Sequence, residues 1–484
     1  MNSDGLVEIP FAATFPLPFR VLFLAGMGIL GWATNLHGLN MLGIDAASAL
    51  ELRKTSTDYS PLRSPLPAYR GSGFKLVTNP ASVYHPIYRL FAVFSAWCFF
   101  AWTIFRFLTH GDVVLVDIFR YVPAICALGV SIILICPFDV IHKRERDMFL
   151  YSIQRCLFSP IDRPVYFSDV IFADIFTSFA KVLGDIWLSV CMLLPGTSLL
   201  VLPTQDGLSR WVLPTIMSLP YLVRLRQCIT EYQSPMNESR RPLYNALKYA
   251  SSFPVIFLSA AQRTVITKII DEQGEERELE AWHGDALFRL WLLAAAINSL
   301  YSFWWDLTND WGLELLALRL PRQSTLSGTI SPPRPLVLPS LHSRSPSGSP
   351  HSALMSSHLP SIPQPFTTTT PHNTHPFGLR STLLYPLPFY PLIIFLNLIL
   401  RLTWSIKLSS HLHSHSEGSV VIFWLEMAEL VRRWLWVFVR VEWEVVKTSQ
   451  GRSSQTMGNE NGHGYEEEEY ELQADPEDAG YDTR

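Results

Sequence analysis

The sequence is poor in charged residues. Asp, Glu, Lys and Arg make up 17% of the 484 residues, while hydrophobic residues make up 48% and the mean hydropathy is positive. Soluble globular domains usually contain about 25% charged residues. The composition therefore argues against a soluble domain and favours a protein that buries much of its surface in a lipid bilayer.

Sequence signatures of catalysis are also missing. The chain has no phosphate-cradling glycine loop, no nucleophile elbow and no HExxH motif. Its six cysteines lie mostly in apolar segments without CxxC spacing, so we interpret them as packing residues. An HxHxH run at residues 411–415 has the composition of a metal site, but such a run in a loop is more often incidental. We expect neither an enzyme nor a metal or cofactor site.

Long apolar runs are what the chain does have. A helix crosses the hydrocarbon core of a bilayer with about 20 apolar residues. The first run lacks a basic n-region and a small-residue cleavage site, so we interpret it as a retained span and not as a signal peptide. The sequence predicts an all-α, polytopic helical membrane protein with about nine transmembrane helices, near residues 17–41, 86–108, 119–137, 170–195, 208–223, 244–262, 285–306, 386–407 and 419–440.

Basic residues alternate between the predicted loops. The 42–85, 138–168 and 224–243 loops are rich in Lys and Arg, whereas the 109–118 and 196–207 loops contain neither. Basic loops face the cytosol. The alternation therefore predicts a lumenal N-terminus (residues 1–16), a cytosolic C-terminus and bilayer lipids as partners.

Two segments do not fit a helical bundle. Residues 318–385 are dense in Ser and Pro, and residues 448–484 form an acidic tail, so we expect both to be disordered. From Gly458 to Arg484 the tail has ten acidic residues and one Arg, so that this part carries −9 and the remainder of the chain +5. A net charge of +5 outside the tail would suit the transport of an anionic solute. Basic residues that anchor the loops at the cytosolic side would give the same net charge.

Several basic residues lie inside the predicted spans. Charged side chains are costly at bilayer depth and therefore indicate function. Arg432 and Arg433 are adjacent in the middle of the last span. With Lys248 and Arg401 they predict a cationic lining, and the guanidinium fork fits the oxygens of phosphate.

Acidic residues in or beside the spans allow two interpretations. Asp306 and Asp310, four residues apart, share one helix face at the end of a span rich in Trp. They either serve function or are two solvated acids just beyond the helix. In the same way, Glu426, Glu429 or Asp306 either support an anion pathway or simply form structural ion pairs with the two adjacent arginines.

Four ordered motifs carry a resemblance to a known family. RLRQCITEY (Arg224–Tyr232), NALKY (Asn245–Tyr249), SLYSFWWDLTNDWGL (Ser299–Leu313) and ELVRRWLWVFVRVEWE (Glu429–Glu444) closely resemble the EXS domain, which includes the eukaryotic phosphate exporters and a fungal branch named for defective retention of ER proteins. The resemblance covers about residues 17–447. It implies N-terminal transmembrane helices at 17–137 and an EXS transmembrane domain at 138–447 with a C-terminal six-helix bundle.

The resemblance also implies a set of site residues. In the exporters, phosphate passes through the bundle of the last six helices along basic and acidic side chains. One position departs from the exporters, because this chain has Thr177 where they have Asn, and a hydroxyl still donates to a phosphate oxygen. The matching pathway residues here are Asp174, Thr177, Lys248, Tyr249, Asp306, Arg401, Trp404, Arg432 and Arg433.

The length of chain before the first span indicates which branch of the EXS family this sequence resembles. The exporters carry a long cytosolic SPX domain there, whereas this sequence has about 16 residues, so we expect SPX regulation to be absent. An EXS core without SPX resembles the fungal Golgi branch, which is implicated in ER protein retention, recycling of Golgi glycosyltransferases and return of phosphate from the Golgi lumen.

Two functional hypotheses result. The first is a transporter in the Golgi membrane, or also in the ER membrane, that returns lumenal inorganic phosphate to the cytosol and so supports glycosylation and retention of resident proteins. The second is a membrane-anchored sorting adaptor whose acidic tail binds coat proteins or proteins that recycle Golgi glycosyltransferases. We expect no nucleic acid among the partners.

Overall fold

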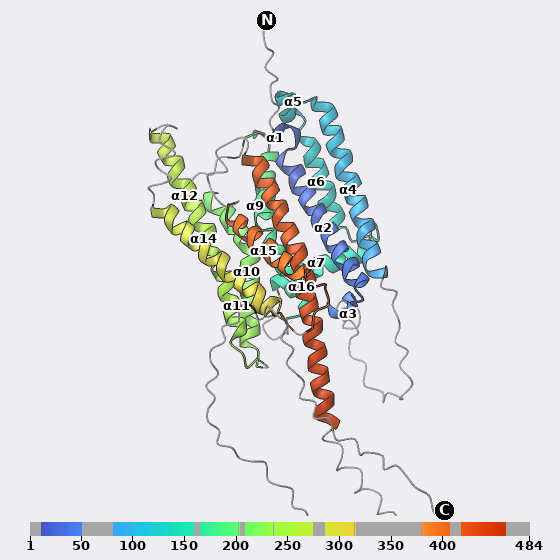
Figure 1. The fold of residues 1–484 in the computed structure, drawn as a ribbon. Coiled ribbons are helices and arrows are strands. Elements are labelled where there is room, and N and C mark those ends of the chain that lie inside the picture. Colours follow the sequence, from blue (N-terminus) through green and yellow to red (C-terminus); the bar gives the residue numbers. More distant parts are fainter. Residues whose placement is uncertain are drawn as a thin grey trace, which may run out of the picture.

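The computed structural model describes residues 11–50, 81–158, 165–201, 203, 209–235, 237–273, 286–313, 315, 379–380, 382–406 and 418–460. This part of the chain is helical and contains no strand, which confirms the predicted all-α membrane fold. Figure 1 shows the helices as one elongated bundle in which most axes run roughly side by side. The elements are α1 (Phe11–Thr14), α2 (Leu17–Met41), α3 (Ala46–Ala49), α4 (Ala81–Thr109), α5 (Val113–Ile118), α6 (Tyr121–Ile135), α7 (Lys143–Phe158), α8 (Phe167–Ser178), α9 (Ala180–Leu193), the 3-10 turn Ser209–Trp211, α10 (Val212–Gln233), α11 (Arg241–Ala250), α12 (Ser252–Gln273), α14 (Ala286–Trp305), the π-helical turn Asp306–Asp310, α15 (Phe389–Ile406) and α16 (Gly418–Glu460).

The N-terminal helices α2, α4 and α6 form one side of the bundle (Figure 1). Helix α2 packs along α4 and also contacts α9 and α16, so it joins this side to the remainder. Many large apolar side chains of α4 and α6, such as Phe99, Phe107 and Ile132, are exposed. Exposed apolar side chains in such number are expected where a helix faces lipid.

Among the described residues, four helices are long and apolar enough to cross a membrane, or five when α8 and α9 count as one bent span. Each of the nine predicted runs is helical over most of its length, but the number that cross the bilayer stays a prediction. Several helices continue beyond the predicted runs: α10 reaches Gln233 where we expect the fifth run to end at residue 223, α12 reaches Gln273 beyond 262, and α16 reaches Glu460 beyond 440. Arg224, assigned to a basic loop, is therefore a helical residue, and it is 3% exposed.

The two segments predicted to be disordered begin or end inside the packed structure. Residues 379–380 and 382–385 of the Ser/Pro-rich segment pack on the bundle, where Leu379 and Tyr385 are buried. Helix α16 continues to Glu460, beyond the expected start of the tail at 448. Residues 316–378 and 461–484, which hold most of both segments, lie outside the described residues.

A buried ion pair joins the middle of α16 to the segment before α15. Arg380 and Glu442 lie 2.5 Å apart, and Tyr390 donates a hydrogen bond to the same carboxylate at 2.5 Å. Arg380 also donates to the Trp311 carbonyl at 2.6 Å. Next to that carbonyl, Gly312 has a φ of +63° and a Cβ there would lie 2.5 Å from the Trp443 ring, so only glycine fits. These contacts hold the π-helical turn against α16.

Candidate functional site

Three interrupted helices meet in the middle of the C-terminal bundle. The bent pair α8 and α9 breaks at Phe179 with a 60° bend, α11 and α12 break at Ser251, and α14 ends in the π-helical turn that starts at Asp306. Irregular backbone at bilayer depth is tolerated where it is buried in protein or lines a cavity, and transporters place substrate sites at such breaks. A π turn is likewise frequent at functional sites. The breaks therefore mark the place to look for a site.

A small cavity of about 30 Å³ lies among these breaks. Four basic side chains and one carboxylate line it, together with hydroxyl and amide groups. This volume suits one or two water molecules and is small for a tetrahedral oxyanion. Its lining residues are Thr177, Tyr221, Lys248, Tyr249, Ser252, Asn298, Ser302, Arg401, Glu429, Arg432 and Arg433.

On one side of the cavity, the Asp306 carboxylate lies close to three basic side chains. Its carboxylate is 0% exposed and binds the Arg401 guanidinium. The ammonium of Lys248 lies 3.9 Å away and the guanidinium of Arg432 3.8 Å away. Asn397 donates to the same carboxylate at 3.3 Å. Two of these three cations also have a carboxylate of their own, because Lys248 lies 3.2 Å from Asp310 and Arg432 pairs with Glu429.

Asp174 anchors the opposite side. Its carboxylate accepts hydrogen bonds from Arg224 Nε at 2.9 Å and from the Tyr249 hydroxyl at 2.5 Å. The Thr177 hydroxyl donates to the Asp174 carbonyl at 2.7 Å, which fixes the last turn of α8 before the break. Tyr221 donates to the Thr177 carbonyl at 3.2 Å. Carboxylate, tyrosine and guanidinium thus hold α8, α10 and α11 together behind the cavity wall.

The two adjacent arginines of α16 have different partners. Arg432 forms a bidentate pair with Glu429 at 2.5 and 3.0 Å, the geometry that guanidinium and carboxylate prefer. Arg433 donates to the hydroxyls of Thr177 and Ser178, both at 3.0 Å, and its guanidinium lies 4.7 Å from the Trp436 ring centroid. Within the described part of the chain, no carboxylate lies at ion-pair distance from Arg433. A buried guanidinium held by neutral groups retains its attraction for an anion.

The structure places the predicted pathway residues close together. Asp174 and Asp306 bind lining residues from behind, and the other described members line the cavity itself. Trp404 lies in α15, and its side chain is outside the described residues. The lining members are Thr177, Lys248, Tyr249, Arg401, Arg432 and Arg433. That phosphate passes along them stays a prediction.

The structure decides between alternatives for the acidic residues. Asp306 and Asp310 are not solvated acids, since both are buried and Asp310 binds Lys248 at 3.2 Å. Of the acids expected as ion-pair partners of the two arginines, Glu429 pairs with Arg432 and Asp306 lies 3.8 Å from it, while Glu426 lies 3.9 Å from Lys181. The HxHxH run at 411–415 lies outside the described residues.

Sequence reasoning missed Arg224 as a site residue. It is buried and pairs with Asp174 directly behind the cavity lining, where it also contacts the Tyr249 hydroxyl. The signal was present in the spacing, because Met217, Tyr221, Arg224 and Cys228 recur at helical intervals and are all buried. We ended the span too early, since a run of Arg224 and Arg226 looks like the basic border of a membrane segment.

The fold and the site define a helical membrane protein with an enclosed, mostly cationic polar site. The chain matches the EXS family over residues 15–446 and belongs to it. It is similar to Protein ERD1 homolog 2 of Schizosaccharomyces pombe, with 27% identity over 447 residues that cover 90% of this chain and 98% of the relative. It is also similar to Protein ERD1 of Kluyveromyces lactis, with 27% identity over 58% of this chain and 59% of the relative. Similarity to the Phosphate transporter PHO1 homolog 1 of Arabidopsis thaliana is 25% identity over 67% of this chain and 32% of the relative.

Proposed function

We propose that this protein transports inorganic phosphate across a membrane of the secretory pathway, from the Golgi lumen to the cytosol. The observation that supports this proposal most directly is the small cavity, which is lined by four basic side chains and one carboxylate. Phosphate is a small dianion or monoanion whose oxygens match guanidinium and ammonium donors. Membership of the EXS family and the similarity to a protein named as a phosphate transporter support the choice of solute.

The carboxylates have a role in this account. Asp306 and Asp174 hold the basic side chains in place when no anion is bound, because uncompensated buried cations would repel one another. Arg433, bound to hydroxyls alone, is the first donor for an entering anion. As phosphate enters, the three cations around Asp306 share their charge between that carboxylate and the phosphate oxygens.

Passage requires the cavity to widen, since its volume of about 30 Å³ suits water molecules. The breaks at Phe179 and Ser251 are the positions where two packed helix pairs can change their relative angle. Rigid helices would then move around a fixed set of ligands, as in other carriers with broken helices.

Phosphate efflux from proteoliposomes tests the proposal. Purified protein is reconstituted with phosphate inside, and efflux is compared for wild type, Arg432→Ala/Arg433→Ala and Arg440→Ala. Arg440 is a matched control on the same helix. It does not line the cavity and lies 2.9 Å from its partner Glu444. We expect efflux from wild type and Arg440→Ala and none from the double variant. A folded wild type without efflux would overturn the assignment.

The sorting-adaptor hypothesis needs a separate test. It is favoured by α16, whose C-terminal half extends beyond the other helices in Figure 1 and leads to the acidic residues. Removal of residues 461–484 discriminates between the two functions. A transporter keeps both its efflux and its support of ER protein retention in cells without these residues, whereas an adaptor loses retention.

A further inference from the structure

A second and much larger cavity lies between the N-terminal helices and the C-terminal bundle. Its volume is about 2200 Å³, which exceeds the 300–1,000 Å³ or so of most small-molecule pockets. Residues of α2, α4 and α6 line one side and residues of α7, α8, α9 and α16 the other. We call it the groove. The transport site does not need it, and only Arg433 lines both cavities.

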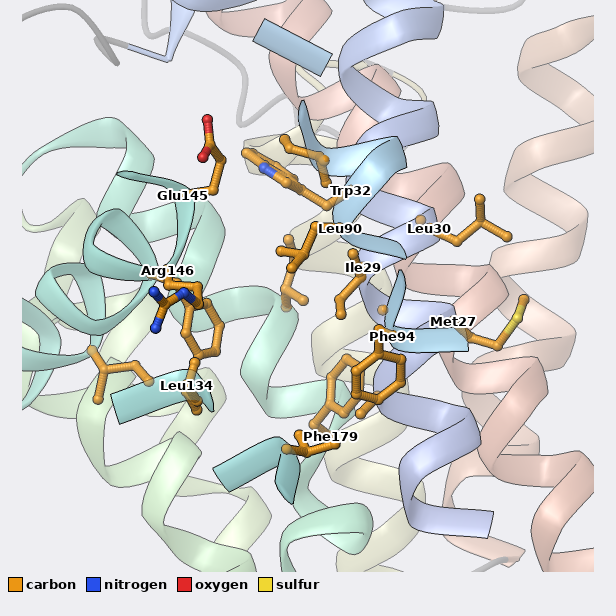
Figure 2. Close-up of a pocket in the computed structure, with 18 of the residues that line it drawn as sticks. Met27, Ile29, Leu30, Trp32, Leu90, Phe94, Leu134, Glu145, Arg146 and Phe179 are labelled. Atoms are coloured by element: carbon orange, nitrogen blue, oxygen red, sulfur yellow. The ribbon is translucent and has the colours of Figure 1, made fainter. Parts of the chain in front are cut away.

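The walls of the groove are apolar over most of their length. Figure 2 shows Ile29, Leu90, Phe94 and Phe179 projecting toward one another from α2, α4 and the α8–α9 break. Water gains no hydrogen bonds from such walls, and empty space of this size between membrane helices is open to lipid. Acyl chains are the material that both fits the walls and is abundant at this depth.

One end of the groove is polar and carries unpaired positive charge. Arg146, 3% exposed, donates all five of its N–H groups to backbone carbonyls between Ile133 and Ile141, including those of Cys136 at 3.0 Å and Val140 at 2.6 Å. It therefore fastens α7 to the end of α6 and has no donor left for a ligand. Lys143 and Arg144 line the same end on α7, and within the described residues none of the three basic side chains lies at ion-pair distance from a carboxylate.

Acidic residues share this end, but one of them is turned away. Asp139, Glu145 and Asp147 also line the groove. Glu145 lies 4.0 Å from His142, and Figure 2 shows its carboxylate pointing away from Arg146. The basic side chains that can meet an anion at this end are Lys143 and Arg144. Basic pockets between membrane helices at the cytosolic side are sites for anionic lipid head groups.

Two buried polar atoms in the wall lack partners among the described residues. Asn35 Oδ1 and Ser189 Oγ find no hydrogen-bond partner there, and the two residues are 3% and 6% exposed. Both residues line the groove. Unsatisfied buried polar atoms are costly, so a ligand with ester, hydroxyl or amine groups gains from meeting them. Trp32, one turn before Asn35 on α2, also lines the groove, and indole rings favour the head-group level of a bilayer.

We propose that the groove binds an anionic glycerophospholipid. Its acyl chains lie between α4 and α9, and its phosphate head group meets Lys143 and Arg144 at α7. Asn35 bonds to the glycerol or head-group region. The lipid thereby fills the space between the N-terminal helices and the EXS bundle, and it contacts the α8–α9 break through Phe179. This binding is independent of whether the central cavity carries phosphate.

Native mass spectrometry of the purified protein tests the proposal. The full chain is incubated with dioleoyl phosphatidylserine or dioleoyl phosphatidylcholine, and retained lipid is counted. We expect wild type to retain one phosphatidylserine. The affinity should fall about thirtyfold in Lys143→Ala/Arg144→Ala, because each basic residue near a head group strengthens binding about five- to sixfold and the two factors multiply. Arg240→Ala, in another basic loop, is the charge control and should bind as wild type. Equal retention of both lipids, or an unchanged affinity in the double variant, would overturn the proposal.

A second pair of variants tests the apolar part without touching charge. Leu90→Trp places an indole inside the groove, whereas Leu128→Trp places one on the exposed face of α6, where Leu128 is 59% exposed. Leu90→Trp should lose the bound phosphatidylserine and Leu128→Trp should keep it. Retention in both variants would show that the lipid lies on the outer surface and would contradict the groove as its site.

Discussion

Arg433 and Arg380 are two buried arginines with the same exposure, 7%, and opposite surroundings. Arg380 meets a carboxylate at 2.5 Å and a backbone carbonyl at 2.6 Å. Arg433 meets two hydroxyls and an aromatic ring. The first arginine is a structural partner whose charge is compensated within the protein. The second keeps a charge that an anion can still compensate, so the partners of a buried arginine say more about its role than its burial does.

The largest effect on stability is expected at the compensated arginine. Glu442→Ala leaves Arg380 buried without its counter-charge, and breaking such a pair by removing one partner costs about 3–5 kcal/mol. The free energy of unfolding, or the yield of monodisperse protein after purification, measures it. Arg440→Ala is the control, because its partner Glu444 is partly exposed. If Glu442→Ala were as stable as this control, the ion pair would not hold α16 as described.

A smaller effect is expected behind the cavity. Tyr249→Phe removes the hydroxyl that donates to Asp174 at 2.5 Å and keeps the ring that lies 4.9 Å from Arg224. Loss of one hydrogen bond to a buried carboxylate should lower the free energy of unfolding by about 1.5–3 kcal/mol. Thermal unfolding of the variant beside Tyr244→Phe, an exposed tyrosine of the same helix, gives the measurement. No difference between the two would show that Asp174 is held by Arg224 alone.

The smallest effect is expected at Thr177. Thr177→Val removes the hydroxyl that accepts from Arg433 at 3.0 Å, so that Arg433 keeps Ser178 alone. Losing one such bond should change phosphate efflux by about fivefold. Thr177→Ser retains the hydroxyl and should transport as wild type. If Val and Ser behaved alike, the hydroxyl would have no part in positioning Arg433.

The helical fold and most of the site could be predicted from the sequence, for a physical reason. Apolar runs and charges inside them are local signals, and Lys248, Asp306 and Arg432 stand out wherever a bilayer is assumed. Which carboxylate pairs with which basic residue depends on the tertiary structure. The sequence does not show that Glu429 pairs with Arg432, or that Glu426 lies near Lys181. Arg224 was missed because a basic residue near the end of an apolar run looks the same whether the helix stops or continues.

The breaks in the helices were likewise beyond the sequence. The bend at Phe179 has no proline or glycine at the break itself to announce it, and the π turn at Asp306 depends on contacts with α15 and α16. The large groove arises from the distance between helices that are far apart in the chain. Its cationic end could be suspected from the basic 138–168 segment, but its apolar depth could not.

We propose that the Arg433 guanidinium binds phosphate, and one binding measurement tests this directly. Inorganic phosphate is titrated into purified wild type, Arg433→Gln and Arg440→Gln, and the thermal unfolding midpoint is followed, since a ligand that binds the folded state raises it. Phosphate should raise the midpoint of wild type and of Arg440→Gln and leave that of Arg433→Gln unchanged. An equal rise in all three proteins would contradict the account, because phosphate would then bind without Arg433.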